Sequence, residues 1–89
     1  MIKFPANLHY GASTHCTLKY ANMKGCPITE DNLLSMFPNK FSDRYNARRA
    51  METLAKYGYA KQIGNTIQIT RLGEMYLAKV AKQYVGEFK

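Results

Sequence analysis

The sequence predicts a small, mainly α-helical domain with one β-hairpin, an α+β fold. Over most of the chain, apolar residues recur at every third or fourth position, which is the period of an amphipathic helix. Between residues 59 and 70 the period changes to two, and the dipeptide Gly64-Asn65 divides that stretch, as in a tight hairpin. The length of 89 residues fits one hydrophobic core. We therefore expect a single unit, with an arm at residues 1–11 and the folded domain at residues 12–89.

Two helices are expected in the first half of the domain. The first covers residues 12–24, and the breaker sequence GCP ends it. Thr29 is a good N-cap for the second helix, because Glu30 and Asp31 then place negative charge in the first turn, where the helix dipole favours it. Pro38 ends this short helix.

The third helix has the most regular pattern. We expect it at residues 43–57, with Ser42 as the N-cap, Asp43 in the first turn and Gly58 as the C-terminal stop. At 100° per residue, one narrow face holds small and apolar side chains: Ala47, Ala50, Met51 and Leu54. The opposite face and its flanks are polar and hold Tyr45, Asn46, Arg48, Arg49, Glu52, Thr53 and Lys56.

The hairpin and a last helix complete the domain. Ile63 is expected to pair with Thr66, which places Ala60, Gln62, Ile67 and Ile69 on one face of the hairpin. Lys61 then lies on the other, polar face. Thr70 is the expected N-cap of a C-terminal helix at residues 71–85.

This order of elements resembles the winged helix-turn-helix superfamily, a DNA-binding fold of small bacterial and phage regulators. Three segments carry the resemblance, which covers roughly residues 12–84: ITEDNLLSMF, RYNARRAMETLAKYGYAK and ITRLGEMYLAKV. They look like the first helix of the helix-turn-helix, the recognition helix running into the first wing strand, and the junction to the closing helix. The resemblance implies a three-helix core, a two-stranded wing, and a recognition helix that enters the major groove.

The charge and the polar face of helix 43–57 lead to the same expectation. The chain has 13 Lys and Arg against 6 Asp and Glu, a net charge of +7, which suits a nucleic-acid partner. We therefore expect a sequence-specific double-stranded DNA-binding protein, a small transcriptional repressor. Arg49 is expected to read guanine and Asn46 adenine, with Tyr45 also at the bases. The expected phosphate contacts are Arg44, Arg48, Lys56, Lys61 and Thr29.

A second class of function stays open on the same residues. Glu52 lies four positions from both Arg48 and Lys56, so this face could be an ion-paired surface. The alternative is a winged-helix interaction module that meets an acidic protein, such as a phage-type inhibitor of a host enzyme or nucleoprotein complex. We expect no enzyme, because no nucleophile arrangement lies near His9 or His15.

No cofactor, metal or membrane is expected. The potential ligands lack the paired spacing of a zinc site: His9, His15, Cys16 and Cys26. No apolar run approaches the length of a bilayer span, and the first residues lack a signal-peptide core, which together predict a cytoplasmic protein.

The last helix has an apolar arc wider than one packing contact needs. Gly73 and three larger residues are spaced 4, 3, 4, like a short heptad seam. This predicts a homodimer on a palindromic DNA site, with an interface of Tyr76, Leu77, Val80 and Tyr84. Alternatively, the arm folds over this helix through Phe4, Leu8 and Tyr10.

Overall fold

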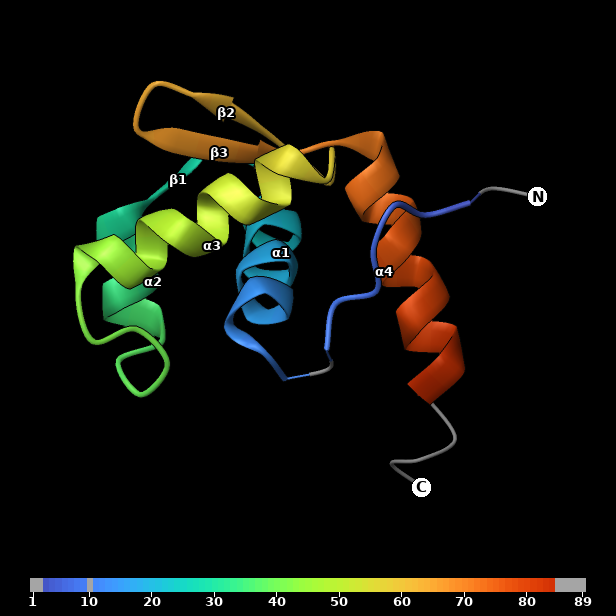
Figure 1. The fold of residues 1–89 in the computed structure, drawn as a ribbon, viewed down its shortest axis with the longest axis horizontal. Helices are drawn as coiled ribbons and strands as arrows, with labels where there is room; N and C mark the ends of the chain where they lie inside the picture. The colour runs from blue at the N-terminus through green and yellow to red at the C-terminus, as the bar shows by residue number, and fades with distance from the viewer. Residues whose placement is uncertain (1–2, 10, 85–89) are drawn as a thin grey trace.

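The computed structural model describes residues 3–9 and 11–84, with side chains only as far as residue 81. In chain order the described elements are α1 (Ser13–Lys24), β1 (Ile28–Thr29), α2 (Glu30–Met36), α3 (Arg44–Lys56), β2 (Ala60–Ile63), β3 (Thr66–Ile69) and α4 (Arg71–Tyr84) (Figure 1). Four helices and a three-stranded antiparallel sheet confirm the predicted α+β class. None of these helices is long and apolar enough to cross a bilayer.

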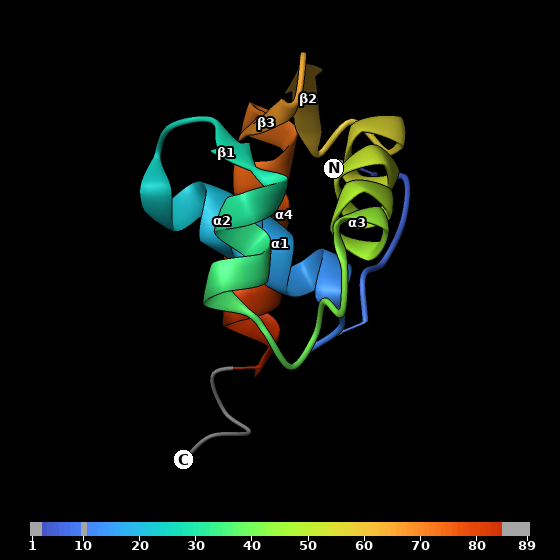
Figure 2. The ribbon, with the colours of Figure 1, turned by 90° about the vertical axis from the view of Figure 1, so that its left-hand side faces the viewer.

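Helix α1 is the centre of the fold. It contacts α3, β3 and α4, while α2 packs on α3 (Figures 1 and 2). Each of these elements contributes at least one fully buried side chain to one core, among them Leu18, Leu33, Leu54, Ile67 and Tyr76. Burial of such side chains drives folding, at about 1.5–3 kcal/mol for each large aliphatic residue.

The helix starts follow from polar side chains at their N-caps. The Thr29 hydroxyl accepts a hydrogen bond from the Asn32 N–H, and the Asn32 side chain accepts one from the Thr29 N–H, a capping box that confirms the predicted start of α2. The N-cap of α3 is Asp43. The prediction that Ser42 caps this helix is therefore wrong. Asp43 accepts from the Asn46 N–H at 2.9 Å, because it lies three residues before that donor.

The sheet has one strand that the sequence analysis did not predict. Ile28 and Thr29 form β1, which pairs with β3 in a sheet of order β1-β3-β2. A strand of two residues is too short to show a period of two. The hairpin itself is as predicted, since Ile63 pairs with Thr66 around Gly64-Asn65.

The N-terminal arm lies against α4 (Figure 1). The ring of Phe4 meets the ring of Tyr76 edge to face, with 5.4 Å between centroids. The Tyr76 hydroxyl accepts from the Leu8 N–H at 2.6 Å. These contacts match the alternative in which the arm folds over the last helix, although Tyr10 lies outside the described residues.

Thr70 caps α4 as predicted, because its hydroxyl accepts from the Gly73 N–H at 3.2 Å. The described part of α4 ends at Tyr84. The predicted continuation to residue 85 therefore lies outside the described residues.

Candidate nucleic-acid interface

One face of α3 anchors the helix and thereby orients the other face toward solvent. Ala47, Ala50, Met51 and Leu54 are all buried, as the sequence pattern predicted. Since side chains on the opposite side of a helix point away from the anchored face, the exposed residues include Tyr45, Asn46, Arg49 and Lys56. The predicted base-reading residues thus lie together on the first two turns of α3.

Tyr45 and Arg49 form a pair on this exposed face. The Arg49 guanidinium lies 5.8 Å from the centre of the Tyr45 ring, a cation–π contact, and Tyr45 is 64% exposed. The Arg49 guanidinium is in no ion pair among the described residues. The Asn46 side chain donates to the Ser42 hydroxyl at 2.9 Å, so both groups sit at the solvent-facing start of the helix.

Two of the predicted phosphate contacts are paired with α2. Arg44 lies 2.8 Å from the Asp31 carboxylate, and Arg48 lies 3.0 Å from the carboxylate of Glu30. In the alternative interpretation of this face Arg48 could pair with Glu52; the ion pair is made by Glu30 instead. The hydrogen bond and the charge of Glu30 raise the pKa of Arg48. These two cations are therefore not free to meet phosphates without losing a carboxylate partner.

The two other cations predicted to contact phosphates are free of ion pairs within the described chain. Lys56 lies at the end of α3, and Lys61 lies on β2; both are exposed. Because α3 packs on β2, the two lysines belong to neighbouring elements. Ile63, at the tip of the hairpin, is 48% exposed.

Thr29 does not have the environment that the sequence analysis assigned to it. Its hydroxyl and its N–H are both used in the capping box with Asn32. Glu30 and Asp31 add two carboxylates to the same turn, and like charge repels a phosphate. We do not retain Thr29 as a phosphate contact.

The residues expected at a dimer interface are largely used inside the chain. Tyr76 is 1% exposed beneath the arm, and Leu77 and Val80 are mostly buried, although both also line the groove described below. Gly73 lies against the backbone carbonyl of Tyr59, so it serves close packing rather than a seam. The side chain of Tyr84 lies outside the described residues.

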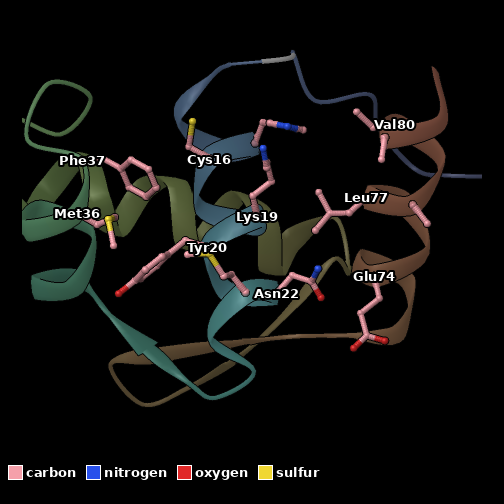
Figure 3. Close-up of a pocket in the computed structure, with 13 residues that line it drawn as sticks. Cys16, Lys19, Tyr20, Asn22, Met36, Phe37, Glu74, Leu77 and Val80 are labelled. Carbon is pink, nitrogen blue, oxygen red and sulfur yellow. The ribbon is translucent and has the colours of Figure 1, made fainter. Parts of the chain in front are cut away.

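An apolar groove of about 870 Å³ lies on the side of α1 away from α3 (Figure 3). Residues of α1, the end of α2 and α4 line it, including Tyr20, Phe37 and Leu77. This groove was not predicted from the sequence, because no single helix pattern reveals a space that three helices enclose together. His15 is one of the lining residues, and its burial, with a smaller effect of Lys19, lowers its pKa.

Comparison with protein-family models, curated proteins and solved structures gives no match to this chain. Among the described residues there is also no group of three or more His, Cys, Asp or Glu side chains placed to hold a metal ion.

Proposed function

We propose that this chain is a sequence-specific double-stranded DNA-binding protein of the winged helix-turn-helix type, a small transcriptional repressor acting in the cytoplasm. The observation that carries the proposal is the exposed start of α3. There Tyr45, Asn46 and Arg49 stand together on a helix whose other face is buried. A major groove about 12 Å wide admits one such helix.

The arrangement of elements supports the same proposal. Helices α2 and α3 follow each other through a short connection, and the hairpin follows α3 directly. The hairpin packs on α3, so Lys61 can reach the DNA backbone beside a groove that holds α3. In this proposal Arg49 reads guanine and Asn46 reads adenine, while Tyr45 stacks on or bonds to either base or phosphate. Lys56 and Lys61 contact phosphates.

A salt titration tests the proposal. Binding of a fluorescently labelled, mixed-sequence duplex would be followed by anisotropy between about 50 and 200 mM salt. Lys56 and Lys61 are free, and Arg44 and Arg48 are held by carboxylates, so we expect about two to four phosphate contacts. The log–log slope should then be about −2 to −4. Absence of binding at about 50 mM salt would refute a DNA-binding function.

Two substitutions separate base reading from phosphate contact. Arg49→Ala should reduce the discrimination between sequences by about 1–3 kcal/mol. Lys61→Ala should weaken binding to all sequences alike, because a phosphate contact carries no sequence information. An equal loss on every sequence for Arg49→Ala would show that Arg49 does not read a base.

One observation favours the alternative, an interaction module for an acidic protein. Arg44 and Arg48 already bind carboxylates, those of Asp31 and Glu30, so this side of α3 suits acidic side chains. Poly-glutamate serves as a probe of carboxylate binding. If the chain binds poly-glutamate at least as tightly as a duplex of equal charge, the alternative is favoured; preference for the duplex supports DNA binding.

A further inference from the structure

The groove on the far side of α1 has a floor and two walls (Figure 3). Its floor is a stripe of α1 at helical spacing: Cys16, Lys19, Tyr20 and Met23. The end of α2 forms one wall and α4 forms the other. Met23 is 71% exposed and Met36 is 48% exposed, unusual for large apolar side chains. Both methionines line the same groove, and contiguous exposed apolar surface is typical of sites that contact another molecule.

The charge of the groove distinguishes it from the rest of the molecule. The chain carries +7, so two copies repel each other wherever cations face cations. Among the described residues that line the groove, only Lys19 and Glu74 carry a full charge, one positive and one negative. Neither is in an ion pair within the described chain. The described lining is therefore neutral, with one unpaired charge of each sign on two different helices.

The outward surface of α4 fits such a groove. Gly73 and Tyr76 are buried, against the Tyr59 backbone and the arm respectively. The exposed line of the helix runs through Glu74, Ala78 and Ala81, spaced 4 and 3, and these residues also form the rim of the groove of their own copy. This is the predicted heptad-like seam moved by one residue. Alanines at these positions allow a second helix to approach closely.

We propose that the groove binds a second copy of this chain, with α4 of each copy lying in the groove of the other. In a dimer with two-fold symmetry, the same surface patch of both copies forms the interface. Each contact between a residue i of one copy and a residue j of the other is therefore made twice. Lys19 of each copy then pairs with Glu74 of the other. Lys19 and Glu74 thereby each gain an ion-pair partner, and the second copy covers the exposed Met23 and Met36. The occupant is thus a second copy rather than an acidic or basic partner, because a neutral groove attracts neither by charge.

The size of the groove sets the strength of the dimer. Thirteen residues of the described chain line it, whereas stable interfaces have about 20–30 residues on each side. We expect a weak dimer, with a dissociation constant between about 1 µM and 1 mM.

The position of the groove has a consequence for DNA, which rests on the proposed function. Helix α3 packs on the side of α1 away from the groove. In the dimer the two α3 helices therefore face away from each other. Such a dimer binds two separate duplexes and has no preference for a palindromic site, in contrast to the dimer that the sequence analysis expected.

The test is a charge exchange, measured without DNA by sedimentation equilibrium. Lys19→Glu and Glu74→Lys should each weaken the dimer at least tenfold, because each places like charges together twice. The double variant Lys19→Glu/Glu74→Lys should restore dimerisation. An equimolar mixture of the two single variants should form a heterodimer, because both contacts then join opposite charges. Lys40→Glu and Glu52→Lys, at exposed positions outside the groove, are the controls for net-charge changes of −2 and +2 and should leave the dimer unchanged.

Three results would overturn the proposal. The wild-type chain could be monomeric at about 1 mM, the upper end of the expected range of dissociation constants. The single variants could dimerise like the wild type, or the mixture could remain monomeric. Circular dichroism of each variant shows whether the fold is kept, and Ala78→Glu, at an exposed position, gives an independent disruption if a charge variant fails to fold. Since no step uses DNA, failure here is distinct from failure of the DNA-binding proposal.

Discussion

The hydroxyl group of Tyr59 makes hydrogen bonds to both the N–H and the carbonyl group of Ala6. It donates to the Ala6 carbonyl and accepts from the Ala6 N–H at 3.2 Å. Its ring stacks on the ring of Tyr76 with 4.7 Å between centroids, and Tyr76 holds Leu8 in the same way. Burial raises the pKa of Tyr59, which keeps the hydroxyl protonated as a donor. These two tyrosines fasten the N-terminal arm to the core.

Tyr59→Phe should therefore loosen the arm and destabilise the fold. Loss of one hydroxyl that serves two partly buried backbone groups should lower the free energy of unfolding by about 1–2 kcal/mol. Urea denaturation measures this change, and hydrogen exchange at the Ala6 N–H should become faster. Tyr57→Phe is the control, because the Tyr57 hydroxyl makes no hydrogen bond among the described residues. Equal stability of both variants would contradict this account of the arm.

Gly73→Ala should destabilise the protein even though alanine favours helices. At an exposed helix position this change would raise stability by about 1 kcal/mol. At Gly73, however, an added Cβ would clash with the Tyr59 carbonyl oxygen and lie 2.9 Å from the Ile69 side chain. We expect a loss of about 1–3 kcal/mol, because α4 must move away from the backbone. A thermal unfolding midpoint that stays the same or rises would show that α4 does not pack this closely.

The stability should decrease as the pH falls below the ordinary pKa of histidine, about 6.5. Burial, and less strongly the charge of Lys19, lower the pKa of His15 in the folded state. The unfolded chain therefore binds a proton at a higher pH than the folded chain, so the contribution is present above about pH 6.5 and is lost below it. His15→Gln should unfold with a smaller change in stability between about pH 7.5 and pH 5.5 than the wild type. The same pH dependence in both proteins would assign the effect to another group.

Asp31→Asn should strengthen DNA binding if α3 meets a duplex. The change releases Arg44 from its exposed ion pair, which adds about one phosphate contact and makes the salt slope steeper by about 0.9. In an Arg44→Ala background the same change should have a much smaller effect, because the released cation is missing. If Asp31→Asn strengthens binding equally in both backgrounds, the effect comes from net charge and not from Arg44.

The sequence predicted those elements whose signals are local. The buried face of α3 and the register of Ile63 with Thr66 follow from spacing within one segment, and both were confirmed. Other contacts join distant parts of the chain. Arg48 and Glu30 are 18 positions apart, and Tyr59 and Ala6, which join the core to the arm, are 53 positions apart. Such contacts depend on how elements pack on each other, which no periodicity within one element reveals. For the same reason the groove beside α1 was missed, whereas β1 was too short to be found.

The most direct test of the central claim, that α3 contacts DNA, is to map the contact by NMR. Amide and side-chain shifts of the isotope-labelled chain would be followed as a mixed-sequence duplex is added at about 50 mM salt. We predict that the largest changes occur at Tyr45, Asn46, Arg49 and Lys61, while signals from the groove, such as Met23 and Leu77, change little. Changes concentrated at the groove, or none on α3 in the presence of saturating duplex, would contradict the claim.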